Sequence, residues 1–395
     1  MKRLKVGVRR HGPAALPHKN RGRKPKHALP ETTRRLIVEV ASGPYRGASC
    51  PHISELLAQG HDILVSPRTV HRVLAASSLN RARRRSPRRH RTRPRMPQEG
   101  LLVQCDASLH HWLEDRGLQC SLLGAVDDAT SKILGLVFRP QEDLRGYLQL
   151  MHDVISRHGV PHTFYTDRHS IFFSAQRDNP TIEDQLAGTT PLSQFGHALD
   201  RLGIHHVASH SPQARGRIER LWGTLHQRLV VELRRAAISS LDDANAFLAG
   251  FIEHFNSSFA VLPEDPSPAF GPAPARADLL VALAFRDTRK ASRASTISYR
   301  GQTYQLATEH GRVAALRPRD TVTVLTRLDG SLRALYGDKP YRLTPVPLPA
   351  RPQAAPTPVP APKTPYRPPA EHPWKSASYQ AYLRRRAALS TTPGG

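Results

Sequence analysis

Three acidic residues lie far apart along the chain, at positions from which folding could bring them together. Asp106 lies within an apolar strand candidate, and Asp167 directly follows another strand candidate at 162–166. Glu219 lies on a long helix expected over 211–235, beside its apolar stripe. In open α/β sheets, ligands bind outside the carboxyl ends of the strands. We therefore expect Asp167 at such an edge, with Asp106 close by.

If the three carboxylates share one cleft, their mutual repulsion and desolvation are costly. Divalent cations remove that cost, and hard carboxylate oxygens suit Mg²⁺. Two such ions can stabilise the attacking and leaving oxygens of an in-line displacement at phosphorus. The spacing of the acids leaves a second interpretation open, in which Glu219 is a solvated surface charge.

The elements around these acids predict one α/β domain over residues 100–260. Three strand candidates with short connections begin near residue 101, and helices and strands alternate after them. Such a pattern predicts a mixed sheet with helices on both faces. After the first three strands, the expected elements are a helix at 143–158, a strand at 162–166, a helix at 192–202, a strand at 204–208 and the long helix.

Residues 29–80 predict three short helices. Ser66 and Pro67 are typical of the N-cap and first position of the third helix, whose outward side carries Arg68 and Arg72. A short helical unit with a basic last helix suits an all-α helix-turn-helix, in which that helix enters the DNA major groove. A generic three-helix bundle with a basic surface is the alternative.

The charge of the chain favours nucleic acid as its partner. The 395 residues include 58 Lys and Arg against 32 Asp and Glu, a formal net charge of +26. Residues 81–99 form an arginine-rich linker, and a basic run of this kind adds salt-sensitive affinity for phosphates; a solvated tail is the alternative. Its expected DNA contacts are Arg83, Arg84, Arg85, Arg88 and Arg89.

The same composition excludes other classes of protein. No run approaches the ~18 apolar residues of a membrane-spanning helix. The three cysteines form no CxxC pair, which indicates a reducing compartment. We expect a cytoplasmic, nucleoid-associated protein without a disulfide framework.

The C-terminal third changes character. Residues 261–291 predict a linker, and 292–345 predict a small all-β barrel with Gly301 and Gly330 in hairpin turns. Residues 346–395 predict a proline-rich, largely disordered tail, with a short basic helix near its end.

Several residues beside the acids have competing interpretations. Arg168 and His169 are candidates for phosphate contact, and Arg215 either binds DNA or tempers the charge of Glu219. His110 and His111 either pack in a turn or touch metal or DNA. Asp127 and Asp128 lie where a strand meets a turn, so we expect each to accept hydrogen bonds from its own turn.

The sequence around each acid resembles a known family. SPQARGRIER at 211–220 resembles the helix bearing the third acid in DDE transposases and retroviral-type integrases. QCDAS around Asp106 and YTDRHSIF around Asp167 resemble the first two acid motifs of bacterial insertion-sequence transposases of the ISNCY group. The resemblance covers about residues 15–345 and aligns Asp106, Asp167 and Glu219 with the catalytic triad.

The resemblance implies an RNase H-like (retroviral-integrase-like) core that binds two Mg²⁺ ions, with Mn²⁺ as a substitute. Asp106 would hold both ions, and Asp167 and Glu219 one each. The implied activity is DNA strand cleavage and strand transfer at the ends of a mobile element. Water frees a 3′-hydroxyl, which attacks target DNA without a covalent enzyme intermediate. Joining two ends of double-stranded DNA requires at least a homodimer.

The chain also departs from the family pattern. Residues 174–191 read as an inserted loop. Residues 1–28 form a basic arm that resembles the end of a preceding helix-turn-helix, so we expect a chain truncated at its N-terminus. No zinc site is expected, since the His/Cys domain of retroviral integrases has no counterpart. The alternative function is a noncatalytic or truncated transposase-derived protein that only binds DNA.

Overall fold

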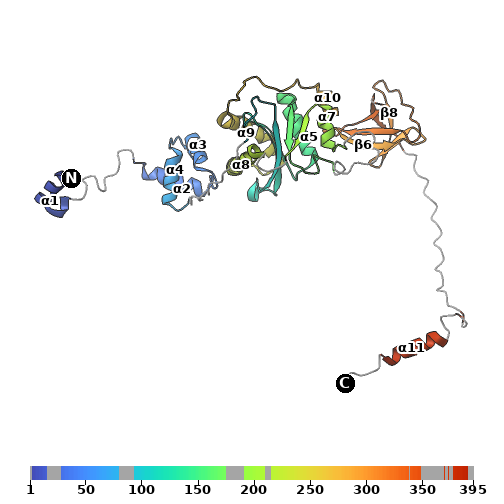
Figure 1. Cartoon of the computed structure of the whole chain (residues 1–395), viewed down its shortest axis with the longest axis horizontal. Helices are drawn as coiled ribbons and strands as arrows, with labels where there is room; N and C mark the ends of the chain where they lie inside the picture. Colours follow the sequence, from blue (N-terminus) through green and yellow to red (C-terminus); the bar gives the residue numbers. More distant parts are fainter. Residues whose placement is uncertain are drawn as a thin grey trace.

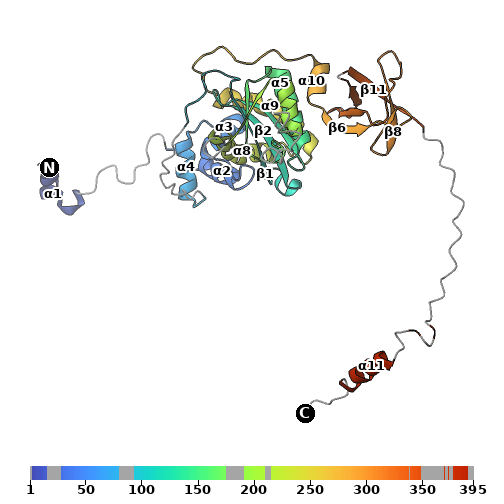
Figure 2. The ribbon, with the colours of Figure 1, turned by 45° about the vertical axis from the view of Figure 1, so that its right-hand side comes forward.

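The computed structural model describes residues 2–15, 28–79, 93–174, 191–209, 215–337, 339–347, 369, 372 and 377–389. Most of these residues form a helical module, an α/β core and a small β domain (Figure 1). Helices α1 (Lys2–His11) and α11 (Ala377–Leu389) lie apart from these three bodies in Figures 1 and 2, and a 3₁₀ turn, η1 (Gly12–Ala15), follows α1. Among the described helices, none has the length and apolarity needed to cross a bilayer.

Some predicted features fall outside the described residues. These are the central linker arginines Arg83, Arg84, Arg85, Arg88 and Arg89, most of the expected loop insertion and most of the proline-rich tail.

The helical module consists of α2 (Glu31–Ser42), α3 (Cys50–His61) and α4 (Pro67–Ala76). Apolar side chains spaced at helical intervals fill its centre, because each helix is too short to be stable without burying one face. As expected, the Ser66 hydroxyl caps α4 by accepting from the backbone N–H of Thr69 at 3.2 Å. The core residues are Ile37, Leu56, Leu57, Val70 and Leu74.

The core sheet has the strand order β3-β2-β1-β4-β5. Its first three strands are antiparallel, and β4 and β5 run parallel to β1. Every residue of β2 is buried, as expected for a strand covered on both faces. The strands are β1 (Val103–His110), β2 (Cys120–Asp127), β3 (Ile133–Arg139), β4 (Thr163–Thr166) and β5 (His205–Ala208); a 3₁₀ turn, η2 (Glu114–Arg116), follows β1.

Helices cover both faces of this sheet, which confirms the predicted mixed α/β architecture (Figure 1). Helices α5 (Leu144–His158) and α7 (Gln194–Arg201) pack on one face. Helices α8 (Gly216–Arg235) and α9 (Leu241–Phe259) pack on the other.

Helix α9 was not among the predicted elements, and it also protects the edge of the sheet. The Asn256 side chain accepts from the backbone N–H of Ile133 at 2.8 Å and donates to its carbonyl at 2.9 Å. Asn245 makes the same pair of bonds with Phe138, at 2.7 and 3.2 Å. These amides satisfy main-chain groups of β3, an edge strand that would otherwise offer them to another chain.

The C-terminal β domain is a barrel-like sheet in the order β6-β9-β10-β11-β8-β7. Gly301 and Gly330 have positive φ angles of 79° and 82°, as their predicted turns require. Its strands are β6 (Phe285–Lys290), β7 (Thr296–Tyr299), β8 (Gln302–Ala307), β9 (Thr321–Thr326), β10 (Leu332–Tyr336) and β11 (Lys339–Pro345).

The predicted linker over 261–291 is wrong in its second half. Helix α10 (Arg276–Ala282) lies there, and β6 pairs with β9 along its whole length. The physical reason is burial: Leu279 and Leu283 pack into the apolar cluster between α5 and the sheet. The segment therefore connects the two domains as folded structure.

Helix α8 joins the helical module to the core. Val231, on α8, lies in the apolar centre of the module. The Arg228 guanidinium, which is 5% exposed as a residue, binds both carboxylate oxygens of Glu55 at 2.6 and 3.0 Å. His52 Nε2 lies 2.7 Å from a carboxylate oxygen of Glu232. One helix thus faces both the sheet and the module (Figure 2).

Candidate active site and nucleic-acid interface

The structure brings Asp106 and Asp167 to the same edge of the sheet. In the parallel pairing of β1 with β4, Val103 lies opposite Phe164 and Gln104 opposite Tyr165, so the continued register sets Asp106 level with Asp167. Both carboxylates face one guanidinium. Arg215 Nη1 is 2.8 Å from Asp106 Oδ1 and 3.7 Å from Asp167 Oδ2.

Helix α8 lies over Asp106 with one face. Residues three, four and seven positions apart share a helix face, and here Arg215, Trp222 and His226 all contact β1. The Trp222 indole N–H donates to Asp106 Oδ2 at 3.1 Å. His226 Nε2 lies 2.9 Å from the hydroxyl of Ser108.

Glu219 lies on this face of α8, between Arg215 and Trp222 and about one turn from each, with its side chain exposed. Within the described residues, no three His, Cys, Asp or Glu side chains converge closely enough to hold a metal ion. Two members of the predicted trio therefore share one guanidinium, and Glu219 lies exposed on α8. The closed metal-binding trio stays a prediction.

The surroundings of Asp106 make its negative charge costly. Burial raises the pKa of Asp106 above its ordinary value, and the charge of Asp167 adds to that rise. The Arg215 guanidinium and the Trp222 N–H lower the pKa but do not cancel the effect of burial. A group in this state is stabilised by any cation that can reach it.

The two aspartates fit a divalent cation by their chemistry. Mg²⁺ is commonly bound through one or two carboxylates, with water and substrate phosphate completing its shell. In the structure the cationic partner is Arg215, whose Nε is buried without a hydrogen-bond partner among the described residues. This guanidinium is thus only partly satisfied where it lies.

The residues after Asp167 form a tight turn. The backbone N–H of His169 donates to Asp167 Oδ1 at 3.0 Å, and the His169 ring accepts from the N–H of Ile171 at 3.3 Å. Arg168 and His169 are exposed beside the pocket, so their predicted phosphate contact stays a prediction.

The structure decides between the alternatives for three residues near the site, His110, Asp127 and Asp128. The His110 ring packs against His226, at 4.4 Å between ring centroids, and against Trp112 at 5.3 Å, as the packing alternative required. Asp127 Oδ2 accepts from the N–H and the hydroxyl of Thr130, both at 2.7 Å, as predicted for a turn. For Asp128 the turn prediction is wrong, because its carboxylate binds groups from distant segments.

Sequence reasoning missed the role of Gln104, whose side chain contacts both Asp128 and α8. The only signal was a polar residue inside an apolar strand, two positions before Asp106. It also missed Trp222 as a partner of Asp106, since an apolar stripe alone does not reveal an indole hydrogen bond.

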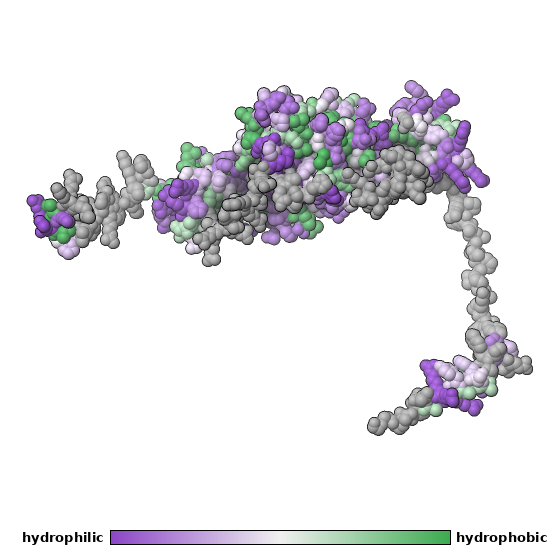
Figure 3. All heavy atoms as spheres, viewed as in Figure 1, coloured by the Kyte–Doolittle hydropathy of each residue, from purple (hydrophilic) through white to green (hydrophobic). Residues whose placement is uncertain are grey.

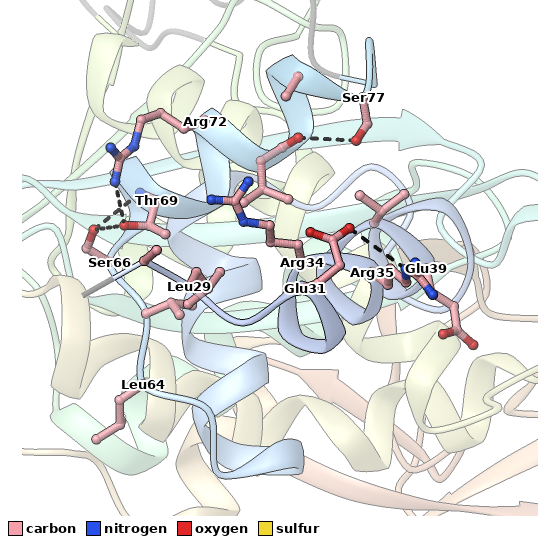
Figure 4. Close-up of a pocket in the computed structure, with 15 residues that line it drawn as sticks. Leu29, Glu31, Arg34, Arg35, Glu39, Leu64, Ser66, Thr69, Arg72 and Ser77 are labelled. Atoms are coloured by element: carbon pink, nitrogen blue, oxygen red, sulfur yellow. Dashed lines mark hydrogen bonds and ion pairs between the residues drawn. The ribbon is translucent and has the colours of Figure 1, made fainter. Parts of the chain in front are cut away.

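A groove between α2 and α4 is the candidate nucleic-acid interface (Figure 4). It encloses about 1090 Å³ and is lined by Arg34, Arg35 and Arg72 among other residues. Arg35 is held by Glu31 at 3.8 Å, and Arg72 donates to the Thr69 hydroxyl at 3.4 Å. Arg34, which sequence reasoning missed, extends into the same groove in Figure 4.

The predicted contacts Arg68 and Arg72 are both exposed on α4. In Figure 3, hydrophilic side chains cover much of the visible face of the helical module and of the outer part of the β domain. Arg215, predicted as a possible DNA contact, binds the two aspartates in this structure.

The chain was compared with protein-family models, solved structures and known protein sequences. No protein-family model matches the chain. Among solved structures, the simian T-cell lymphotropic virus intasome in complex with PP2A regulatory subunit B56 gamma matches 78% of this chain and 99% of its own, with 15% identity and a TM-score of 0.33. The magnesium-bound HTLV-2 integrase catalytic core (trimeric form) matches 38% of this chain and 82% of its own, with 17% identity and a TM-score of 0.27. Likeness at these scores supports no structural argument.

Sequence similarity is stronger. The transposase for insertion sequence IS1202 of Streptococcus pneumoniae is 29% identical over 417 aligned positions, covering 96% of this chain and 88% of that protein. The putative transposase y4bF of Sinorhizobium fredii (strain NBRC 101917 / NGR234) is 35% identical over 263 residues, which cover 67% of this chain. The chain spans only 56% of the length of y4bF. The predicted resemblance to insertion-sequence transposases is confirmed as a sequence similarity to these two proteins.

Proposed function

We propose that this protein is a DDE transposase of the ISNCY type, which binds the ends of a mobile DNA element and catalyses metal-dependent strand cleavage and strand transfer. The observation that carries the proposal is the pairing of Asp106 and Asp167 under one guanidinium, beneath the face of α8 that bears Glu219. The similarity to transposases supports the same activity.

The proposed metal ligands are Asp106, Asp167 and Glu219, in an RNase H-like core. Mg²⁺ or Mn²⁺ bound there would stabilise the attacking and leaving oxygens of phosphoryl transfer. As the resemblance implies, Asp106 would hold both ions, and Asp167 and Glu219 would hold one each.

The chain's own residues prepare the site. Trp222 holds Asp106 Oδ2 in place through its N–H, which fixes the orientation of the carboxylate. Arg215 offers a planar guanidinium suited to a phosphate. We propose that it leaves the aspartates for the DNA backbone when a cation and substrate bind.

The helical module and the linker supply the proposed DNA affinity. Arg68 and Arg72 on α4 would contact element-end DNA, with Arg34 beside them, and the arginines of the linker would add sequence-independent phosphate contacts. The proposed domain division sets the module at 29–80, the linker at 81–99 and the core at 100–260. Double-stranded DNA is the proposed partner of at least a dimer, working in the cytoplasm on the nucleoid.

The test uses labelled element-end duplexes with Mg²⁺ or Mn²⁺. Asp167→Asn should abolish cleavage and leave the DNA dissociation constant within about twofold, because carboxylate ligands contribute to chemistry and not to backbone binding. Asp200→Asn, on the exposed side of α7, is the matched control and should cleave normally. An active Asp167→Asn variant would refute the assignment. A wild-type protein that binds ends but never nicks them would favour the noncatalytic alternative.

A further inference from the structure

A buried carboxylate lies at the base of α8, outside the proposed metal site. Asp128 follows β2 and is 0% exposed. Its Oδ1 accepts from Gln104 Nε2 at 2.9 Å and from the guanidinium of Arg93, and its Oδ2 accepts from the backbone N–H of Met96 at 2.9 Å. None of these bonds lies within the turn that contains Asp128. The Asp128 carboxylate instead connects segments that are distant in the sequence.

Gln104 carries the hydrogen-bonded connection from Asp128 to α8, and an ion pair between Arg217 Nε and Asp128 Oδ1 at 3.8 Å lies beside it. Gln104 is fully buried in β1, two residues before Asp106. Its Oε1 accepts from the backbone N–H of Ile218 at 3.2 Å. Ile218 immediately precedes Glu219, so this bond fixes the main chain next to the third acid.

The bond to Ile218 replaces a missing helix cap. The N–H groups of the first helical turn have no partner within their own helix. The residue at the N-cap of α8 is Arg215, which makes no side-chain capping bond. Gln104 satisfies one of these N–H groups from a strand, and it thereby sets how α8 lies on β1.

The end of the linker is also tied to the main chain of the Asp128 turn. Arg95 Nη1 donates to the carbonyl oxygens of Asp128 and Ala129 at 3.2 and 3.0 Å. Arg217, in the first turn of α8, donates to the carbonyl of Arg93 at 3.1 Å. The last residues of the linker and the first turn of α8 therefore share one anchor.

We propose that Gln104 and Asp128 are positioning residues, which hold the first turn of α8, and with it Glu219, in place on β1, and which fix the end of the linker at the same point. This inference rests on the proposed function. Neither residue needs to touch DNA or metal. A displacement of about 1 Å at a reacting group can cost about 100-fold in rate, so such an anchor matters for catalysis.

The neighbouring Asp127 offers a control that distinguishes a loss of positioning of α8 from a loss of stability alone. It is also 0% exposed, but its carboxylate serves Thr130 in its own turn and the N–H of Gly100 at 2.9 Å. Asp127→Asn therefore removes a buried carboxylate of the same size one residue away, without a direct bond to α8 or to the linker. It is the matched control.

The experiment compares Gln104→Met and Asp128→Asn with that control, by hydrogen exchange and by single-turnover cleavage in Mn²⁺. Gln104→Met should speed exchange at the amides of 216–220 by about tenfold, the equivalent of one net hydrogen bond. It should lower the cleavage rate by about 10- to 100-fold while DNA affinity stays within about twofold, since the phosphate-binding arginines remain. Asp127→Asn should leave both readouts at wild-type values even where its melting temperature falls.

A paired swap provides the rescue. Asp128→Asn with Gln104→Glu reverses the polarity of the bond between the two side chains and retains an acceptor for Ile218. It should recover at least part of the exchange protection and rate lost in Asp128→Asn. The proposal is overturned if exchange at 216–220 is unchanged in Gln104→Met, or if it rises while cleavage stays normal. A wild-type protein without metal-dependent cleavage would instead overturn the proposed function, and the exchange arm would still decide whether Gln104 holds α8.

Discussion

Replacing Gly124 by alanine should displace Trp222 from Asp106. Gly124 lies opposite Asp106 in the β1–β2 pairing. A Cβ there would lie 2.8 Å from the Trp222 ring, so the ring must retreat by about 0.6 Å to reach the ordinary contact distance of 3.4 Å. A shift of that size directed away from Asp106 would lengthen the 3.1 Å bond between the indole N–H and Asp106 to about 3.7 Å, beyond the hydrogen-bonding range.

The expected result is a double loss. Overpacking a core costs about 1–3 kcal/mol in the free energy of unfolding, measurable by urea denaturation. Misplacing Asp106 should lower single-turnover cleavage by about 10- to 100-fold. Gly135→Ala is the control, because its Cβ would lie 2.9 Å from Leu150 on the opposite face of the sheet. It should cost similar stability and leave cleavage nearly intact. Equal cleavage rates in the two variants would refute the role given to Trp222.

Three further predictions follow from named contacts. Burial raises the pKa of Asp106, so the free energy of unfolding should fall as the pH rises from the ordinary aspartate pKa of about 4 through the raised value. Asp106→Asn should lack this loss in thermal melts recorded from about pH 4 upwards, and a pH profile identical to that of the wild type would contradict the prediction. Arg72→Ala should weaken DNA binding regardless of sequence and reduce the slope of log affinity against log salt by about one; an unchanged slope would exclude a phosphate contact. Glu55→Gln should leave the buried Arg228 without its ionic partner and lower the free energy of unfolding by about 1 kcal/mol. This value is kept small because the Glu55 side chain is 40% exposed, so solvent screens the pair. Unchanged urea melts would show that the contact contributes nothing to stability.

Much of the fold could be predicted because local signals agreed with tertiary packing. The Ser66-Pro67 pair marked the start of α4, and Gly159 marked the end of α5, where it has a φ of 99°. Both features are encoded within a few residues. The strand β6 was missed because its sequence, FRDTRK, is polar and forms a strand only by pairing with β9.

The site was predictable in its residue types and not in its contacts. The apolar strand patterns place Asp106 within one strand and Asp167 directly after another, so their meeting could be expected. That Arg215 lies between them could not, because its partners are distant in the sequence and local spacing does not encode them. The same holds for Asp128, whose partners come from the linker and β1.

Helix α8 has a mechanical consequence for the proposed reaction. Its N-cap residue Arg215 binds the aspartates and its first turn carries Glu219. About 2.5 and 3.6 turns after Glu219, Arg228 and Glu232 hold the helical module. A helix rises only 1.5 Å per residue and is stiff over this length. If the module grips an element end as proposed, the binding energy gained there acts on the orientation of Glu219 through a single rigid element. Binding energy from remote contacts can then be used to align the reacting groups, which raises the rate of the chemical step and not merely the affinity. Variants that loosen the module from α8 should for this reason lose cleavage rate before they lose DNA binding.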